Sequence, residues 1–278
     1  MELTQSVYAG EYFDPEKTLE SGQSFRYRRQ GKGFSVYSAD KACVVYREGD
    51  STIVLSSEED KKYFENYFEK DCDYGKFVAA AKSCGVPAVS AAAEAGKGIR
   101  FLRQNAEETI FSFLLSQNNN IPRIRSIIDK LTLTLGKRKE LLGESYYTFP
   151  SAAVLAEKDE SFFRDLGAGY RAKFLVSAAK RLAEEGTERL SALDTPSLVK
   201  ELTGFYGIGE KVADCIALFG FGRQECFPVD TWIEKVYRDE FGGTEKDRHK
   251  IAAYFKERFG KESGRIQQYL FCYKREKT

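Results

Sequence analysis

The sequence predicts an α+β fold with a small antiparallel sheet at the N-terminus and a helical core after it. Between residues 22 and 56, short segments rich in β-branched and aromatic residues alternate with turn sequences. From about residue 97, apolar residues recur at helical spacing, and glycine, proline and asparagine separate the segments. The strands come first and the helices follow, so the pattern favours segregated layers over a parallel βαβ sheet.

The composition limits the classes of function. The 278 residues are 42% hydrophobic and 31% charged, as in an ordinary soluble globular protein, and the formal net charge is only +1. Any nucleic-acid binding must therefore use local groups and not bulk charge. The six cysteines are scattered and there is a single histidine, so we expect no side-chain metal site, no iron–sulfur cluster and no Ser-His or Cys-His hydrolase. No apolar run approaches the length of a membrane span, and the first residues do not resemble a signal peptide.

The sheet and the core are predicted as two domains, residues 1–96 and 97–278. Four segments predict the strands, and a charged helical segment follows them at residues 56–74. The strand segments are SFRYRR (24–29), GFSVYS (33–38), ACVVYRE (42–48) and TIVLSS (52–57).

In the core, Asn105 followed by Glu108 resembles a capping box before a helix that is apolar nearly all round and should be buried. That helix ends at the asparagines of residues 118–120, and Pro122 suits the first turn of the next helix. Further helical segments follow, separated by glycine.

Residues 196–222 predict a helix, the tight turn FYGIG and a second helix. Glycine at 207 and 209 permits backbone angles that other residues avoid, and it lets another backbone come close. The second helix begins near Glu210, where exposed N–H groups suit a phosphate. Lys211 lies at this positive helix end, where a cation is disfavoured. A plain corner between two helices is the alternative interpretation.

A loop (223–231) follows and leads to the start of the next helix. Asp230 lies at this start, and the alternative interpretation is that Asp230 serves only as the N-cap of that helix.

Six segments in this order resemble the 8-oxoguanine DNA glycosylases of the eukaryotic type, in the helix-hairpin-helix superfamily of base-excision glycosylases. The segments are SGQSFRYR (21–28), FLRQNAEETIFSFLLSQNNNIPRI (101–124), LGAGYRAKF (166–174), GIGEKVADC (207–215), PVDTW (228–232) and GRIQQYLF (264–271). The resemblance covers most of the chain. It implies a bifunctional DNA glycosylase/AP lyase that excises 8-oxoguanine from duplex DNA. A related glycosylase for another damaged purine and a non-catalytic DNA-binding module are the alternatives, and a mere binder would need neither Lys211 nor Asp230.

By resemblance, Lys211 is the amine nucleophile that attacks C1′ of the damaged nucleotide and forms a Schiff base. The amine must be deprotonated to attack, and burial and the positive helix end should both lower the pKa of Lys211. Asp230 should stabilise the developing positive charge on the sugar.

The resemblance also implies a pocket for a base flipped out of the duplex. The carbonyl of Gly22 would accept a hydrogen bond from the N7–H of 8-oxoguanine. Cys215 and Phe271 would lie on the two faces of the purine, and Gln267 would hydrogen-bond its Watson–Crick edge. Phe219 lies one helical turn beyond Cys215 and should alter the pocket. The structural alternatives are a strand-entry turn for Gly22 and a core position for Phe271.

Four residues match family residues that contact the DNA where the damaged base has left the duplex. Asn118, Arg123 and Arg171 match residues that contact the orphaned cytosine, and Tyr170 matches the aromatic wedge that holds the base stack open. The alternatives are a helix C-cap for Asn118 and ordinary exposed charges for the two arginines.

The turn should bind the DNA backbone through Gly207, Gly209, Lys211 and Val212. No cofactor is expected beyond a structural monovalent cation on the backbone carbonyls of Thr203, Phe205 and Ile208. Trp232 departs from the histidine that many family members carry there. The expected partner is duplex DNA with 8-oxoguanine, preferentially opposite cytosine. We expect a monomer that, in a prokaryote, is cytoplasmic and nucleoid-associated.

Overall fold

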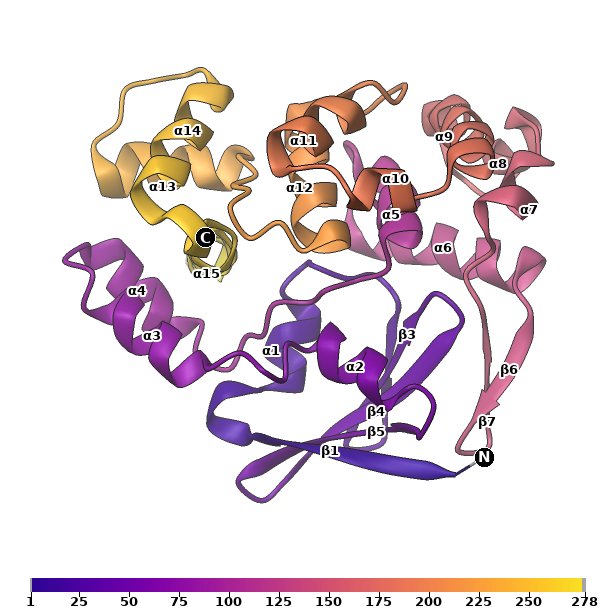
Figure 1. Cartoon of the computed structure of the whole chain (residues 1–278), viewed down its shortest axis with the longest axis horizontal. Coiled ribbons are helices and arrows are strands. Elements are labelled where there is room, and N and C mark those ends of the chain that lie inside the picture. The colour runs from indigo at the N-terminus through magenta and orange to yellow at the C-terminus, as the bar shows by residue number, and fades with distance from the viewer. Residues whose placement is uncertain (1, 277–278) are drawn as a thin grey trace.

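The computed structural model describes residues 2–276 and places a five-stranded sheet beside an arc of helices (Figure 1). The strand order is β1-β5-β4-β3-β2, and all neighbouring strands are antiparallel. The strands are β1 (Leu3–Ala9), β2 (Tyr27–Gln30), β3 (Gly33–Ser38), β4 (Lys41–Glu48) and β5 (Ser51–Ser57). The predicted fold class is confirmed, and each of the four predicted strands is present.

The sequence-based prediction missed two strand features. β1 pairs with β5 over its whole length, but its polar residues 4–6 weaken the strand signal. A second hairpin, β6 (Arg138–Leu141) and β7 (Glu144–Tyr147), lies within the region predicted as helical. Its turn residues Leu142 and Gly143 both have positive φ, 54° and 78°, which suits a two-residue hairpin loop. The flanking residues are mostly charged and exposed, so they carry no alternating apolar pattern.

Helices form most of the rest of the described chain. They are α1 (Pro15–Glu20), α2 (Lys61–Tyr67), α3 (Tyr74–Lys82), α4 (Pro87–Ala95), α5 (Ala106–Ser116), α6 (Ile121–Leu135), α7 (Ala152–Ala156), α8 (Glu160–Asp165), α9 (Ala172–Glu185), α10 (Glu188–Ser191), α11 (Thr195–Thr203), α12 (Glu210–Phe221), α13 (Thr231–Phe241), α14 (Arg248–Phe259) and α15 (Ser263–Glu276), with short 3₁₀ turns η1 (Gly10–Tyr12), η2 (Gly169–Arg171) and η3 (Gly260–Glu262). Within residues 2–276, no helix has the length and apolarity needed to cross a bilayer.

The capping box predicted at α5 is only half formed. Asn105 caps the helix, because its side chain accepts the N–H of Glu108 at 2.9 Å. The Glu108 carboxylate does not reach back to Asn105. It accepts Arg26 Nη1 at 2.9 Å and the Ala39 N–H at 2.6 Å, both from the sheet region. Glu108 therefore joins the buried helix to the sheet.

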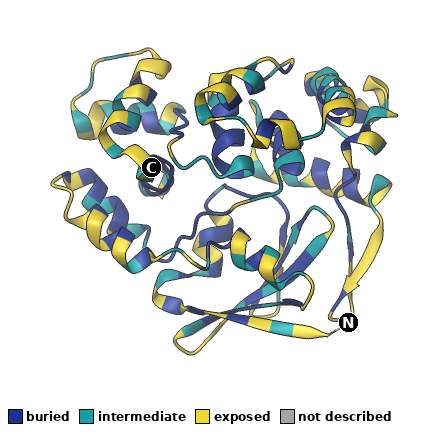
Figure 2. Cartoon of the chain, viewed as in Figure 1, coloured by how far each residue is buried: buried dark blue, intermediate teal, exposed yellow. Residues whose placement is uncertain are grey.

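Three main hydrophobic clusters hold the elements together, and Figure 2 shows buried residues along the inner faces of sheet and helices. One surrounds α5, α6, α9 and α12, and another lies on the sheet beneath α2. The third joins α3 and α4 to α13, α14 and α15. The helices α3 and α4 thus precede residue 96 but pack against the C-terminal helices (Figure 1). The domain boundary at residue 96 stays a prediction.

A buried carboxylate, Glu69, links the segment after α2 to α15. Arg265 donates from Nη2 to Glu69 Oε1 at 2.8 Å and from Nε to Oε2 at 3.1 Å. Tyr74 and Arg103 donate to the same carboxylate at 2.7 and 3.0 Å. The Glu69 side chain is fully buried and that of Arg265 is 9% exposed, so neither charge has water as an alternative partner.

Replacing Glu69 by glutamine is expected to lower the free energy of unfolding by about 3 kcal/mol, because it removes the buried counter-ion of Arg265 and leaves only the half-exposed Glu262 as a partner. Urea unfolding of both proteins measures this difference. The control is Glu262→Gln: Glu262 also pairs with Arg265, at 2.8 Å, but is 47% exposed, so its loss should cost less than about 1 kcal/mol. Equal losses in the two variants would contradict the role given to Glu69.

Candidate active site

One pocket gathers both predicted catalytic residues and all five predicted base-pocket residues. It lies where the segment after α1, the start of α12, the loop before α13 and the middle of α15 meet. Its lining residues are Gly22, Phe113, Lys211, Cys215, Phe219, Pro228, Asp230, Gln267, Gln268 and Phe271. Residues from both ends of the chain are therefore brought to a single site.

Lys211 lies in the first turn of α12, directly after the N-cap Gly209 and Glu210. Its side chain is half-buried, and no ion pair within residues 2–276 involves it. The pKa of Lys211 is raised, first by its interaction with Cys215 and also by Asp230, while burial opposes the rise; burial also raises the pKa of the Cys215 thiol. The expectation of a lowered pKa is therefore wrong. That expectation considered burial and the helix N-terminus, but not Cys215 and Asp230, which the fold brings close to the amine. Lys211 must lose a proton before it can attack.

Asp230 caps α13, as the sequence predicts. Its Oδ1 accepts the N–H groups of Trp232 and Ile233 at 3.0 and 2.9 Å. Its second oxygen accepts no hydrogen bond from the described residues, so it remains available in the pocket that Lys211 also lines. The cap and a catalytic role are thus compatible. Trp232 contributes its N–H to this cap, and its ring lies 4.5 Å from Lys235 Nζ.

The raised pKa of Lys211 predicts a reaction that accelerates with pH. Below that pKa the protonated form dominates, and each pH unit upward increases the free amine about tenfold. Removing the ionisable group of Cys215, as in Cys215→Ser, should lower the pKa of Lys211 and move the rise to lower pH. The rate of borohydride trapping on an abasic-site duplex measures this, because no base then needs to occupy the pocket. Superimposable pH profiles would contradict the assignment.

Gly22 is held by a group of buried glutamines. Gln23 donates to the Arg100 carbonyl at 2.9 Å, and its own side-chain oxygen accepts the Leu102 N–H at 2.9 Å. Gln268 donates to the carbonyl of Ser21 at 3.0 Å. Gly22 itself has φ +89°, a conformation that favours glycine. Its carbonyl is thus placed by neighbours on both sides. Gln268 was missed by the sequence-based prediction, because a glutamine at helical spacing carries no signal of its own.

Gln267 has an unused acceptor in the pocket. Its Nε2 donates to the Pro228 carbonyl at 3.2 Å, whereas its Oε1 is buried and has no partner among the described residues. A buried acceptor without a partner is costly unless a ligand supplies a donor. This supports the predicted contact between Gln267 and the edge of a base.

Phe219 and Phe113 form an aromatic wall of the pocket. Their rings stack with centroids 5.7 Å apart and planes 7° apart. Phe101 also stacks with Phe219, with ring centroids 5.4 Å apart. Phe219 is 5% exposed, so it is mainly a core residue that also borders the pocket. Phe113 was missed by the sequence-based prediction, because it looks like one more apolar residue of a buried helix.

The predicted opposite-base residues lie around the loop between α5 and α6. Asn118 is exposed, has φ +47°, and its side chain has no hydrogen bond among the described residues. Arg123 is exposed and donates to the Gly167 carbonyl at 3.2 Å. Tyr170 is 46% exposed, as a wedge requires.

Arg171 differs from one of the two interpretations of the sequence, that of an ordinary exposed charge. It is buried, so it is not an ordinary exposed charge. Its guanidinium donates to the carbonyls of Gln117, Asn118 and Ala168. Most of its donors are therefore occupied in holding the loop that presents Asn118. The direct contact of Arg171 with cytosine stays a prediction.

The hairpin turn has one position that requires glycine. Gly207 has φ +90°, and a Cβ there would lie 2.4 Å from the ring of Phe174. Gly209 has φ −88° and open space around its missing Cβ, so the expectation of special backbone angles at Gly209 is wrong. Val212 is buried within the first turn of α12, so we expect its backbone N–H, and not its side chain, to contact the predicted phosphate.

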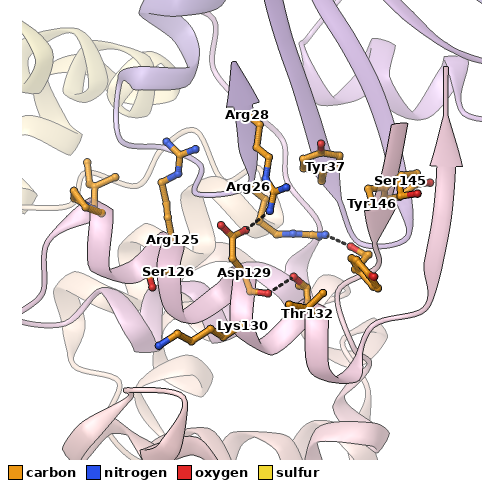
Figure 3. A pocket seen from close by; sticks show the side chains of 14 residues that line it. Arg26, Arg28, Tyr37, Arg125, Ser126, Asp129, Lys130, Thr132, Ser145 and Tyr146 are labelled. Atoms are coloured by element: carbon orange, nitrogen blue, oxygen red, sulfur yellow. Dashed lines mark hydrogen bonds and ion pairs between the residues drawn. The ribbon is translucent and has the colours of Figure 1, made fainter. Parts of the chain in front are cut away.

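A larger cavity of about 680 Å³ lies outside this pocket, between α6, the sheet and the β6–β7 hairpin (Figure 3). Its charged groups are largely paired. Arg28 contacts Asp129 at 3.4 Å, Arg26 donates to the Tyr147 carbonyl, and Arg125 donates to that of Tyr27. It contains neither predicted catalytic residue. Residues 2–276 contain no cluster of His, Cys, Asp and Glu that could hold a metal ion.

Comparisons with known proteins agree with this geometry. The N-terminal domain of 8-oxoguanine DNA glycosylases matches residues 6–110, and the HhH-GPD superfamily of base excision DNA repair proteins matches residues 111–261. The 8-oxoguanine glycosylase/lyase of Clostridium acetobutylicum, solved with double-stranded DNA containing cytosine opposite 8-oxoguanine, is 34% identical. That match covers 96% of this chain and 93% of that one, with a TM-score of 0.89.

Two further proteins are similar. MBOgg1, solved with a low-affinity DNA ligand, is 33% identical over 99% of this chain and 96% of its own, with a TM-score of 0.92. The N-glycosylase/DNA lyase of Saccharomyces cerevisiae is 29% identical over 80% of this chain and 67% of its own length. This chain spans 52% to 67% of the length of the curated N-glycosylase/DNA lyase relatives. The chain belongs to the HhH-GPD superfamily of base excision DNA repair proteins and, within it, to the 8-oxoguanine DNA glycosylases.

Proposed function

We propose that the protein is a bifunctional DNA glycosylase/AP lyase that removes 8-oxoguanine from duplex DNA. The single observation that carries this proposal is the pocket in which Lys211 and Asp230 meet Gly22, Cys215 and Gln267. An amine and a carboxylate there face groups suited to holding a purine. A DNA-binding module that performs no chemistry would need neither of them.

The chemistry starts when the damaged nucleotide is flipped out of the duplex into the pocket. The bond between C1′ and the base breaks, and the base leaves with the bonding electrons and takes up a proton. The free amine of Lys211 forms the new bond to C1′, and the unbonded oxygen of Asp230 stabilises the positive charge that develops on the sugar. Opening of the sugar ring gives a Schiff base. Loss of a C2′ proton then expels the 3′ phosphate and cleaves the strand.

Selectivity for the oxidised base would come from one hydrogen bond. 8-Oxoguanine carries a hydrogen on N7 and guanine does not, so the Gly22 carbonyl can bond only the damaged base. A site built around a donor rejects the analogue that lacks it. The buried contacts of Gln23 and Gln268 around this segment give the carbonyl a fixed position.

The preference for cytosine opposite the lesion rests on Asn118 and Arg123, which are exposed beside the wedge Tyr170. Arginine can donate to cytosine acceptors that thymine does not present in the same way. A monomer acting on duplex DNA, and a cytoplasmic, nucleoid-associated location in a prokaryote, complete the proposal.

A monovalent cation at the hairpin turn is the one bound ion that we propose. Its ligands would be the backbone carbonyls of Thr203, Phe205 and Ile208. The Phe205 carbonyl accepts the Ile208 N–H at 3.0 Å, whereas those of Thr203 and Ile208 accept no backbone hydrogen bond within residues 2–276. Two oxygens are thus free for an ion, which would hold the turn in the shape that presents its N–H groups.

The function is tested with duplexes that carry one 8-oxoguanine opposite each of the four bases, and with a guanine duplex as control. We expect release of free 8-oxoguanine, fastest opposite cytosine, with strand cleavage at the same site. Guanine should stay in place. Release of a different damaged purine in preference would redirect the proposal to that base. Tight binding without any base release would favour the binding-module alternative.

A further inference from the structure

Three aromatic rings form a continuous ridge between the predicted wedge and the hairpin turn, and the two outer rings are exposed. We call Tyr170, Phe174 and Tyr206 the aromatic ridge. Tyr170 belongs to η2, Phe174 to the first turn of α9, and Tyr206 to the turn between α11 and α12. The ring of Phe174 meets Tyr170 edge-on at 5.9 Å and Tyr206 edge-on at 5.1 Å. The ridge thus joins two elements that are distant in the sequence.

The ridge is a built feature and not a chance exposure. Gly207 leaves room for the Phe174 ring, since a Cβ there would lie 2.4 Å from it. Phe174 is half-buried and its ring contacts both neighbouring rings. Tyr206 is 52% exposed and its hydroxyl has no hydrogen bond among the described residues. Large apolar side chains exposed together usually mark a binding surface.

A positive charge accompanies the rings. Lys173 Nζ lies 5.2 Å from the centroid of Tyr206 and 5.5 Å from that of Phe174. No carboxylate of residues 2–276 pairs with Lys173. An ammonium beside exposed aromatic rings is the combination that proteins use to hold a nucleic-acid strand, with the charge on a phosphate and the rings against sugar and base.

We propose that Tyr206 and Lys173 form a second DNA contact, which grips a nucleotide beside the flipped one. The ridge continues directly from the wedge Tyr170 to the turn of Gly207, and so it spans the distance between the opened base stack and the phosphates. In this arrangement Tyr206 packs against a deoxyribose and base edge, and Lys173 contacts the adjoining phosphate. The inference rests on duplex DNA being the substrate of the proposed function.

Because neither Tyr206 nor Lys173 lines the base pocket, both should act on DNA binding and not on chemistry. The test is the dissociation constant for a duplex with a tetrahydrofuran abasic analogue, which has no base to release and forms no Schiff base. Tyr206→Ala should weaken binding about tenfold, within the range found for one aromatic contact. Tyr206→Phe keeps the ring and should stay within about twofold. The single-turnover rate at saturating protein should change less than about threefold.

The two residues should differ in their response to salt. Lys173→Gln should reduce the slope of log K against log salt by about one, because one phosphate contact is lost. Tyr206→Ala should leave that slope unchanged. The control is Val7→Ala: Val7 is 53% exposed on β1, away from the hairpin, and should have no effect on binding.

Thermal unfolding separates this role from support of the fold. An exposed ring lost from a turn should move the unfolding midpoint little. The proposal would be overturned if Tyr206→Ala bound the duplex within about twofold of the wild type. It would also be overturned if Val7→Ala, or Tyr206→Phe, lost as much affinity as Tyr206→Ala. The binding assay needs no base excision. Its result can therefore be interpreted even if the protein proves to have no 8-oxoguanine activity.

Discussion

Replacing Lys211 by glutamine is expected to abolish release of 8-oxoguanine, lowering the single-turnover rate by at least about 10⁴-fold, as loss of a nucleophile does in other enzymes. Glutamine keeps a similar length but has no amine that can form a bond to C1′. The pocket should stay formed, because no ion pair among the described residues involves the Lys211 side chain, and glutamine can still donate a hydrogen bond toward Cys215. Single-turnover kinetics on a duplex with 8-oxoguanine opposite cytosine measure the effect.

A neighbouring lysine provides the control for this variant. Lys200 is exposed on α11 and does not line the base pocket. Lys200→Gln removes the same charge from the same region and should keep the rate within about twofold of the wild type. Duplex binding by Lys211→Gln should remain, because the backbone of the turn supplies the predicted phosphate contacts. Substantial base release by Lys211→Gln would exclude this residue as the nucleophile.

Asp230→Asn is expected to lower the single-turnover rate by about 10²- to 10³-fold, the range found when one group that stabilises a developing charge is removed. Asparagine is as good an N-cap as aspartate, so the bonds to the N–H groups of Trp232 and Ile233 should persist. Binding of the duplex should change only a fewfold. The loss would thus fall on the chemical step.

The matched variant is Asp230→Ala, which removes both the charge and the cap. It should lose about the same catalytic rate as Asp230→Asn and, in addition, about 1 kcal/mol of folding stability. Chemical unfolding measures this second loss. If Asp230→Asn kept the wild-type rate while Asp230→Ala did not, Asp230 would be only an N-cap.

The antiparallel sheet and the hairpin helices could be predicted from the sequence, because both have strong local signals. The strand segments alternate with clear turns, and GIG separates two apolar helical runs. Elements without such signals were missed. β1 is polar and acquires its strand conformation by pairing with β5, and the charged β6–β7 hairpin depends on positive φ at Leu142 and Gly143.

For the site, resemblance predicted the residues that line the pocket, but not the interactions that control them. The direction of the Lys211 pKa shift depends on its distance from Cys215 and Asp230, which only the fold sets. Gln268 and Arg171 act by holding backbone carbonyls, and such a role leaves no mark on the sequence.

The central claim is that the amine of Lys211 bonds to C1′ of the excised nucleotide. The most direct measurement is borohydride reduction during the reaction with a duplex carrying 8-oxoguanine opposite cytosine, followed by mass mapping of the cross-linked peptide. We expect one covalent protein–DNA product, linked at Lys211 and absent from Lys211→Gln. Release of 8-oxoguanine without any covalent product, or a product linked at another residue, would contradict the account.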